Sequence, residues 1–235
     1  VNVEEQWVRV EPGVIRDDLN HYLKSYGLMF GPETSTASRA MVGGMIGNNS
    51  SGLHSIVWGD TRSNLIAAKL LLDDASEVCF EALDESQLFS KLSANSREGE
   101  IYRQFNALLT DVDNQAAIAA GYPKKSLSRR NTGYALDVMQ DSATAFNLCN
   151  LLAGSEGTLG IITEAKLQLM PLPPATLGLL CIHFTNMLEC MWGNIAALAH
   201  HPEASELVDK YIIDFTVGHP TYQHNRFFIE GDPEA

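Results

Sequence analysis

Cysteine is scarce in this sequence of 235 residues, and it never occurs in a metal-binding pattern. The four cysteines, Cys79, Cys149, Cys181 and Cys190, form no CxxC pair and do not stand at zinc-site spacing with histidine. No metal site is therefore predicted. The pattern indicates reduced, mostly buried thiols of a cytosolic protein, and a disulfide between Cys181 and Cys190 stays open.

Positive charge and long apolar runs are also scarce. Sixteen Lys and Arg stand against twenty-nine Asp and Glu, which gives a formal net charge of −13. Such a chain repels nucleic-acid phosphates and anionic lipid headgroups, so neither is expected as a partner. No apolar run approaches the roughly 18 residues of a transmembrane segment. We therefore predict a cytoplasmic location.

Apolar residues are plentiful, at 45% of the chain, which is enough for a sizeable core. Their spacing predicts strands over 6–10, 65–72, 77–83, 161–169 and 177–184, and helices over 14–26, 85–92, 100–120, 144–152 and 186–199. A further short helix is expected near 39–46, and a strand near 227–230. This mixture predicts an α+β protein, with a domain boundary at the prolines of 171–174. Because both ends resemble strands, we expect an excised piece of a longer protein, although an ordinary chain with ordered ends is the alternative.

The segment Gly43–Gly52 is the strongest candidate for a ligand-binding loop. It holds four glycines in ten residues, together with short polar side chains from Asn48 to Ser51. Glycine lets the backbone approach a ligand closely, so its amides could cradle a phosphate without Lys or Arg. The segment has neither the Gly-Lys-Ser/Thr of a Walker loop nor Rossmann spacing. A turn that only reverses the chain explains the composition equally well.

Two other segments attract attention for the same reason. Gly154–Thr163 is a glycine turn between a predicted helix and a strand, and Arg129–Asp137 is a basic loop with one tyrosine. Taken singly, each is interpreted as an ordinary connection. Among the seven histidines only His54, just after the first glycine segment, is singled out.

In order along the chain, six segments match one family: 8–14, 30–36, 43–52, 58–61, 131–134 and 156–163. With these segments the chain resembles the FAD-linked oxidases of the vanillyl-alcohol-oxidase type, which carry a PCMH-type FAD-binding domain. Within them it is most similar to D-lactate and D-2-hydroxyglutarate dehydrogenases, especially long bacterial fusions with iron–sulfur centres. The likeness covers roughly residues 6–174.

The resemblance implies an architecture and a cofactor site. Residues 1–172 would be the second lobe of the FAD-binding domain, a mixed or antiparallel sheet flanked by helices, and residues 175–235 the start of an α+β cap domain. FAD would be held without a covalent bond. The residues implied to line it are Pro32, Thr34, Ser35, Thr36, Gly43, Gly44, Met45, Ile46, Asn48, Asn49, Ser51, Gly52, Tyr134, Glu156, Gly157, Gly160, Ile161 and Ile162.

Several segments that are typical of the family have no counterpart in this sequence. Nothing matches the family's first FAD lobe, its histidine-rich catalytic segments or an iron–sulfur cysteine cluster, and Ala75 replaces the usual glycine of a hairpin turn. No catalytic residue is therefore nominated, although Arg129 and Arg130 could contact an anion. We expect the chain alone to bind FAD weakly or not at all, to be inactive, and to leave an apolar face that favours self-association.

The parent protein is expected to oxidise a D-2-hydroxy acid, D-lactate or D-2-hydroxyglutarate, by hydride transfer to FAD. It would pass the electrons to a separate acceptor, could also carry iron–sulfur clusters, and could sit peripherally at the membrane. Two other interpretations remain open at this point. One is a binding or interaction domain that keeps the scaffold without the cofactor, and the other is an FAD oxidase of an alcohol or sugar.

Overall fold

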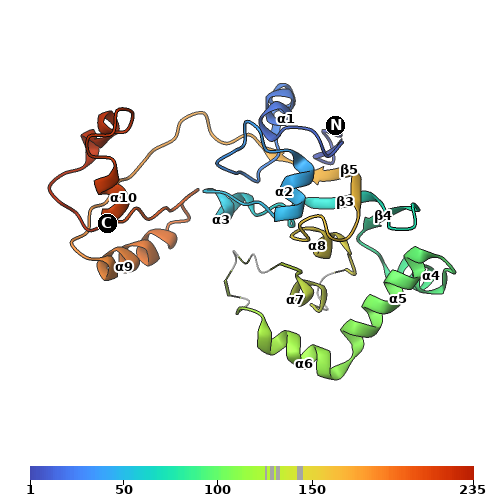
Figure 1. Cartoon of the computed structure of the whole chain (residues 1–235). Coiled ribbons are helices and arrows are strands. Elements are labelled where there is room, and N and C mark those ends of the chain that lie inside the picture. The colour runs from blue at the N-terminus through green and yellow to red at the C-terminus, as the bar shows by residue number, and fades with distance from the viewer. Residues whose placement is uncertain (125, 128–129, 131–132, 142–144) are drawn as a thin grey trace. The chain divides into compact units, whose positions relative to one another are not determined.

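The computed structural model describes residues 1–124, 126–127, 130, 133–141 and 145–235 (Figure 1). These residues form two compact units, Val1–Leu172 and Pro173–Ala235. We call them the N-terminal unit and the C-terminal unit and describe each by itself.

The N-terminal unit is built on a four-stranded sheet with the order β1-β5-β3-β4. Its strands are β1 (Trp7–Val10), β3 (Leu65–Leu71), β4 (Glu77–Glu81) and β5 (Ile161–Gln168). Every neighbouring pair is antiparallel, with Val8 opposite Leu167 and Ala68 opposite both Ala165 and Phe80. A second, two-stranded sheet pairs β2 (Leu28–Met29) with β6 (Met170–Pro171). The predicted α+β class and the hairpin of β3 and β4 are confirmed.

The two faces of the larger sheet differ because apolar and charged residues alternate along its strands. Val8 and Val10 are buried on β1 while Arg9 between them is exposed. On the charged face, the Glu164 carboxylate lies 3.2 Å from Arg9 Nε and 3.1 Å from Lys69 Nζ, which links β1, β5 and β3. The apolar face therefore points into the core and the charged face toward solvent.

Helices and the buried sheet face share one continuous apolar cluster. The helices of the N-terminal unit are α1 (Arg16–Leu23), the 3-10 turn η1 (Lys24–Tyr26), α2 (Val42–Asn48), α3 (Ser55–Trp58), α4 (Glu85–Ser93), α5 (Arg97–Thr110), α6 (Val112–Gly121), α7 (Leu136–Met139) and α8 (Cys149–Leu152). Fully buried side chains come from α1, α2, β3, α5 and β5, among them Leu23, Val42, Ile46, Leu70, Tyr102 and Leu167. A helix near 39–46 was predicted, and α2 occupies that place.

The helix predicted over 100–120 is two helices, α5 and α6. They meet at Asp111, which has an extended backbone (φ −70°, ψ 129°). Its carboxylate accepts a hydrogen bond of 2.9 Å from the backbone N–H of Asn114, so it caps α6. The apolar spacing did not reveal this break because the periodicity continues across the cap.

The hairpin turn between β3 and β4 places Ala75 in the left-handed region, at φ +65°. The Ala75 N–H donates to Leu72 O at 3.1 Å, and the Asp74 carboxylate accepts from the Ser76 N–H at 2.9 Å. A residue with a Cβ is strained in this conformation, whereas glycine adopts it freely.

The C-terminal unit contains α9 (Met187–Leu198), α10 (Lys210–Phe215) and the 3-10 helix η2 (Gln223–Phe228). Asn186 caps α9, since its side chain accepts a hydrogen bond from Glu189 N at 2.9 Å. The strands predicted over 177–184 and 227–230 are wrong: 177–184 has no regular structure, and 227–228 belong to η2 while 229–230 are irregular. Within the first of these segments, Phe184 forms two backbone hydrogen bonds of 2.9 Å. Its N–H donates to Ala235 O, and its carbonyl accepts from the N–H of Glu234.

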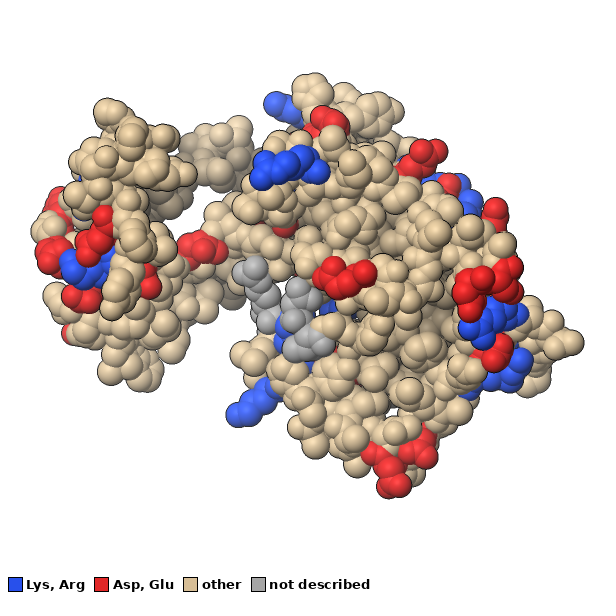
Figure 2. All heavy atoms as spheres, viewed as in Figure 1, with Lys and Arg blue, Asp and Glu red and all other residues tan. Residues whose placement is uncertain are grey.

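All four cysteines are free. Among the described residues, no helix combines the length and the apolar character needed to span a bilayer. On the face shown in Figure 2, the basic side chains of the described residues stand in separate groups, some of them beside acidic side chains.

Candidate functional site

The first glycine segment becomes helix α2 and the loop that follows it. Met45 and Ile46 are buried, at 2% and 0% exposure, so their side chains belong to the core and only their backbone could meet a cofactor. Gly43 lies against Pro12, because a Cβ there would stand 2.8 Å from Pro12 Cβ. At Gly44 a Cβ would meet nothing within 4 Å, so its backbone faces open space.

The second glycine segment docks directly onto the end of α2. The N–H of Gly154 donates to Ile46 O, and the N–H of Glu156 donates to Gly47 O, both at 2.9 Å. A Cβ on Gly47 would stand 3.7 Å from Glu156 Cα and from Gly157 N, so the two backbones are in close contact. The last carbonyls of α2 are thereby satisfied by a distant turn, and two motifs far apart in the sequence form one surface.

Side chains after α2 fasten its loop in place. Asn49 has a left-handed backbone at φ +52° and is 1% exposed. Its amide nitrogen donates to Asp60 Oδ2 at 2.9 Å, and its amide oxygen accepts from Arg62 N at 2.8 Å. Thr61 donates to Ser50 O through its N–H at 3.0 Å and its hydroxyl at 2.7 Å. Asn49 thus holds the loop together, with both ends of its side-chain amide engaged.

The sequence analysis missed Arg62, a buried guanidinium beside these loops with 9% exposure. It donates to Asn150 O at 3.0 Å, to Ala153 O at 2.6 Å and to Gly133 O at 3.3 Å. Burial lowers the pKa of Arg62, and the carboxylates of Asp60 and Asp137 oppose that shift. The matched segment 58–61 ends one residue before Arg62. The acceptors of the Arg62 guanidinium are backbone carbonyls, which no residue type in the sequence indicates.

The segment Pro32–Thr36 is held beside the glycine loop by Glu33. The Glu33 carboxylate accepts from His54 N at 3.1 Å and lies 2.8 Å from His54 Nδ1, while the His54 ring stacks on Trp58 at 4.0 Å between centroids. A Cβ on Gly52 would stand 2.4 Å from Glu33 Cβ, so only glycine fits there. His54, the one histidine singled out, is a partner of Glu33.

Tyr134 joins the third motif to the same surface. Its hydroxyl is hydrogen-bonded to the Thr158 hydroxyl, which also donates to Ser155 O at 2.7 Å. Arg130 is paired with Asp137, so its charge is already partnered. Arg129, Asn131 and Thr132, which belong to the predicted basic loop, lie outside the described residues.

Further predicted residues differ in what surrounds them. Ile161, at the start of β5, is 67% exposed, while Ile162 packs against the core. A Cβ on Gly160 would stand 3.1 Å from Leu71 O, whereas a Cβ on Gly157, which has a left-handed backbone at φ +76°, would meet nothing within 4 Å. Thr34 and Thr36 bond each other through their hydroxyls at 3.1 Å.

A polar cavity of about 300 Å³ opens beside Arg62. Two cations and two carboxylates line it, so its charge is balanced. Its walls are Ser51, Ser55, Gly59, Asp60, Arg62, Ser63, Arg130, Ala135, Asp137, Val138 and Asn150.

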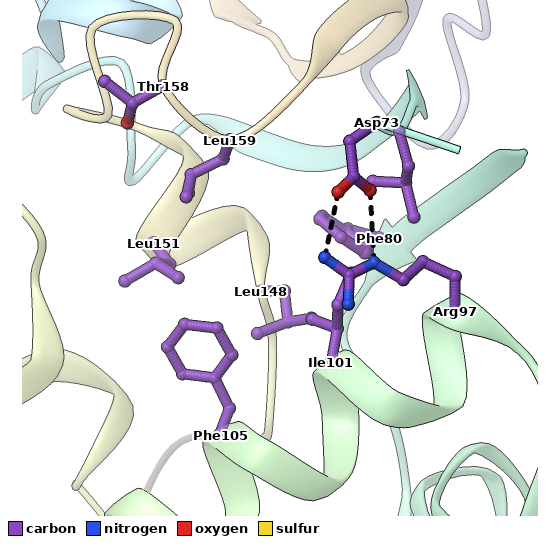
Figure 3. Close-up of a pocket in the computed structure, with 10 residues that line it drawn as sticks. Asp73, Phe80, Arg97, Ile101, Phe105, Leu148, Leu151, Thr158 and Leu159 are labelled. Carbon is purple, nitrogen blue, oxygen red and sulfur yellow. Dashed lines mark hydrogen bonds and ion pairs between the residues drawn. The ribbon is translucent and has the colours of Figure 1, made fainter. Parts of the chain in front are cut away.

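A second cavity of about 250 Å³ is apolar and lies between the hairpin, α5 and α8 (Figure 3). At its rim Arg97 forms two hydrogen bonds with the Asp73 carboxylate, at 3.1 and 3.0 Å, which lower the pKa of Asp73. Leu159 lines this cavity and anchors the second glycine turn by packing there.

Comparison with known proteins gives two kinds of match. Residues 1–79 match a family model described as FAD binding domain. The whole chain is 35% identical, over 235 residues, to a D-2-hydroxyglutarate dehydrogenase of Pseudomonas putida, of which it covers 23%. The chain is therefore similar to FAD-binding proteins over residues 1–79 and to this dehydrogenase over its whole length.

Two further relatives carry related names. A D-2-hydroxyglutarate dehydrogenase of Escherichia coli is 40% identical over 181 residues, which cover 74% of this chain and 17% of that protein. A D-lactate dehydrogenase of Anaerostipes hadrus is 26% identical over 208 residues, which cover 88% of this chain and 32% of that protein. The chain therefore spans less than a quarter of the length of the two D-2-hydroxyglutarate dehydrogenases.

The surface fits the cofactor of this family. A dinucleotide needs backbone that it can approach closely, and added Cβ atoms on Gly44 and Gly157 would meet nothing within 4 Å. The neighbouring Ser51 and Thr34 supply short polar groups without adding charge. Among the described residues no group of three or more His, Cys, Asp or Glu is placed to hold a metal ion.

Proposed function

We propose that the N-terminal unit forms part of the FAD site of a D-2-hydroxy-acid dehydrogenase. The observation that carries this proposal is the pair of hydrogen bonds from Gly154 and Glu156 to the end of α2, which joins the two glycine segments into one surface. The FAD-binding domain match over residues 1–79 supports the cofactor, and the relatives' names support the reaction class.

Backbone groups would do most of the cofactor binding. The amides of Gly44, Gly52 and Gly157 would meet the dinucleotide, the hydroxyls of 34–36 and Ser51 would orient it, and the exposed Ile161 would cover it from water. When bound, FAD supplies the two-electron oxidation of a 2-hydroxy acid to a 2-keto acid. No residue of this chain is assigned the proton transfer.

The rest of the site is proposed to lie in parts of the relatives that this chain does not match. Since the chain covers only 17–23% of the D-2-hydroxyglutarate dehydrogenases, we propose that alone it binds FAD weakly or not at all and is inactive. The whole protein would pass electrons to a separate acceptor, with iron–sulfur clusters as one route, in the cytoplasm or at the membrane surface. Residues 175–235 would begin the cap domain.

Self-association of the isolated chain is part of the same proposal. Large apolar side chains are exposed on the C-terminal unit, among them Leu179, Leu180 and Phe227 at 80–90%. Apolar surface of this kind associates readily in water. Sedimentation of the purified chain at several concentrations should therefore show species heavier than the monomer.

The reaction is tested with the full-length gene product that carries this sequence. The purified protein should show a flavin absorbance band, and anaerobic addition of D-2-hydroxyglutarate should bleach it. D-lactate tests the second candidate substrate, which the D-lactate dehydrogenase relative supports, and L-2-hydroxyglutarate is the stereochemical control. A flavin band that no 2-hydroxy acid bleaches would contradict the substrate class, and a full-length protein without flavin, even after FAD is added, would favour a binding domain that keeps only the scaffold.

Titration of the isolated chain with FAD completes the test. We expect little quenching of flavin fluorescence. Saturable quenching would mean that segments 32–52 and 154–162 hold the cofactor by themselves, and that the remaining parts of the site contribute less than proposed.

A further inference from the structure

Arg62 is the residue that joins all three glycine-containing segments, the first through its backbone and the other two through its side chain. Its backbone N–H donates to Asn49 Oδ1 at 2.8 Å, on the loop after α2. Its guanidinium donates to the carbonyls of Asn150 and Ala153, at the end of α8, and of Gly133, at 3.0, 2.6 and 3.3 Å. A planar guanidinium holds several acceptors in a fixed geometry, which a lysine ammonium cannot do.

The second glycine segment is shaped around this guanidinium. Gly154 has a left-handed backbone at φ +92°, and a Cβ there would stand 2.9 Å from both Arg62 Nη2 and Gly133 O. The N–H of the same residue donates to Ile46 O at 2.9 Å. One glycine therefore accommodates Arg62 on one side and joins α2 on the other.

Loss of these hydrogen bonds would be costly in free energy because the guanidinium is buried. A buried charge without partners is costly, and hydrogen bonds to charged groups are among the stronger ones in proteins. Arg62 donates hydrogen bonds to carbonyls at the end of the short helix α8 that have no partner within the helix. Loss of the guanidinium would leave these carbonyls without a donor and would loosen the turn that follows them.

From these contacts we infer that Arg62 is a positioning residue of the FAD site, which sets the spacing between the loop after α2 and the turn at Gly154–Gly157. This inference rests on the proposed function. The guanidinium acts through backbone carbonyls and does not itself touch the cofactor.

The matched control is Arg103, an arginine with similar bonds elsewhere. It donates to Leu92 O at 2.9 Å and to Ala94 O at 2.7 Å, at the end of α4, and touches neither glycine segment. R62K and R103K both replace the planar guanidinium with an ammonium, and only R62K disturbs the loops.

The experiment compares the two variants in the full-length gene product at a temperature where both are folded. Hydrogen exchange is measured at the amides of Gly154 and Glu156 without FAD, and FAD affinity is measured by flavin fluorescence. We expect R62K to speed exchange at both amides and to weaken FAD binding about tenfold, the equivalent of one charge-assisted hydrogen bond, while R103K changes neither. If R62K does not fold, R62Q is measured in its place.

The outcomes separate the inference from the proposed function. Faster exchange with unchanged FAD affinity, or equal losses of affinity in R62K and R103K, would overturn the positioning role. A wild-type protein that binds no FAD would overturn the proposed function. In that case the exchange rates still report whether Arg62 holds the loops, although a role in FAD binding is then refuted.

Discussion

The two units of this chain differ in what they bury. The N-terminal unit encloses a continuous apolar cluster in which Leu70, Ile46 and Leu167 are fully buried. In the C-terminal unit only Cys190, Pro233 and Ala235 are buried. Apolar composition alone therefore does not make a core, because a core also needs partners that cover each apolar face.

Strand formation illustrates the same difference. The apolar segments 65–71 and 177–184 both predict a strand, and β3 forms because β5 and β4 pair with its two edges. The C-terminal unit contains no strand that could pair with the segment 177–184, so the backbone of this segment is irregular. A strand is stabilised by cross-strand pairs, which no local pattern specifies.

Separating the units should give the largest effect. Residues 1–172 expressed alone should unfold in one cooperative urea transition, because their core lies within that segment. Residues 173–235 expressed alone should show no cooperative transition by Trp192 fluorescence. A sharp transition in the second piece would contradict the comparison.

Truncating one leucine in each unit sharpens the comparison. Leu70→Ala opens a cavity at a residue with 0% exposure and should lower the free energy of unfolding by about 2–5 kcal/mol. Leu180→Ala, at 80% exposure, should change it by less than about 0.5 kcal/mol. Urea titrations of the two variants measure both values, and equal losses would mean that Leu180 is covered in solution.

A smaller gain is expected from the hairpin turn of the N-terminal unit. Ala75→Gly relieves the left-handed strain at φ +65° and should raise the free energy of unfolding by about 0.5–1 kcal/mol. Ser76→Gly in the same turn serves as a control for added backbone freedom, and it should not stabilise. A loss of stability in Ala75→Gly would show that the turn has another conformation.

The smallest effect concerns the cap of α4, where a capping box joins Asp84 and Gln87. The Gln87 N–H, which donates to the Asp84 carboxylate at 2.8 Å, lowers the pKa of Asp84, and the Ser86 hydroxyl adds to this. A lowered folded-state pKa means that the stabilisation is present near neutral pH and is lost as the pH falls below about 4. The urea midpoints of wild type and Asp84→Ala should therefore differ at neutral pH and converge in acid. The difference in midpoint between Asp84→Asn and Asp84→Ala should not change with pH in this way, because neither side chain titrates.

Much of the fold follows from local patterns, and the site follows only in part. The hairpin, the place of α2 and the Asn186 cap could be predicted because neighbouring residues determine them. Glycine composition marked the loops of the candidate site, and family resemblance supplied their order. Arg62 and the Glu33–His54 pair could not be predicted, because their partners come from distant segments and, for Arg62, are backbone carbonyls common to every residue.

Hydrogen exchange of the full-length gene product with and without FAD tests the central claim most directly. FAD should slow exchange in peptides covering 43–52 and 154–162 together, while the α5 peptide 97–110 stays unchanged. Protection of neither glycine segment in a protein that demonstrably holds FAD would contradict the claim that these two segments form one cofactor surface.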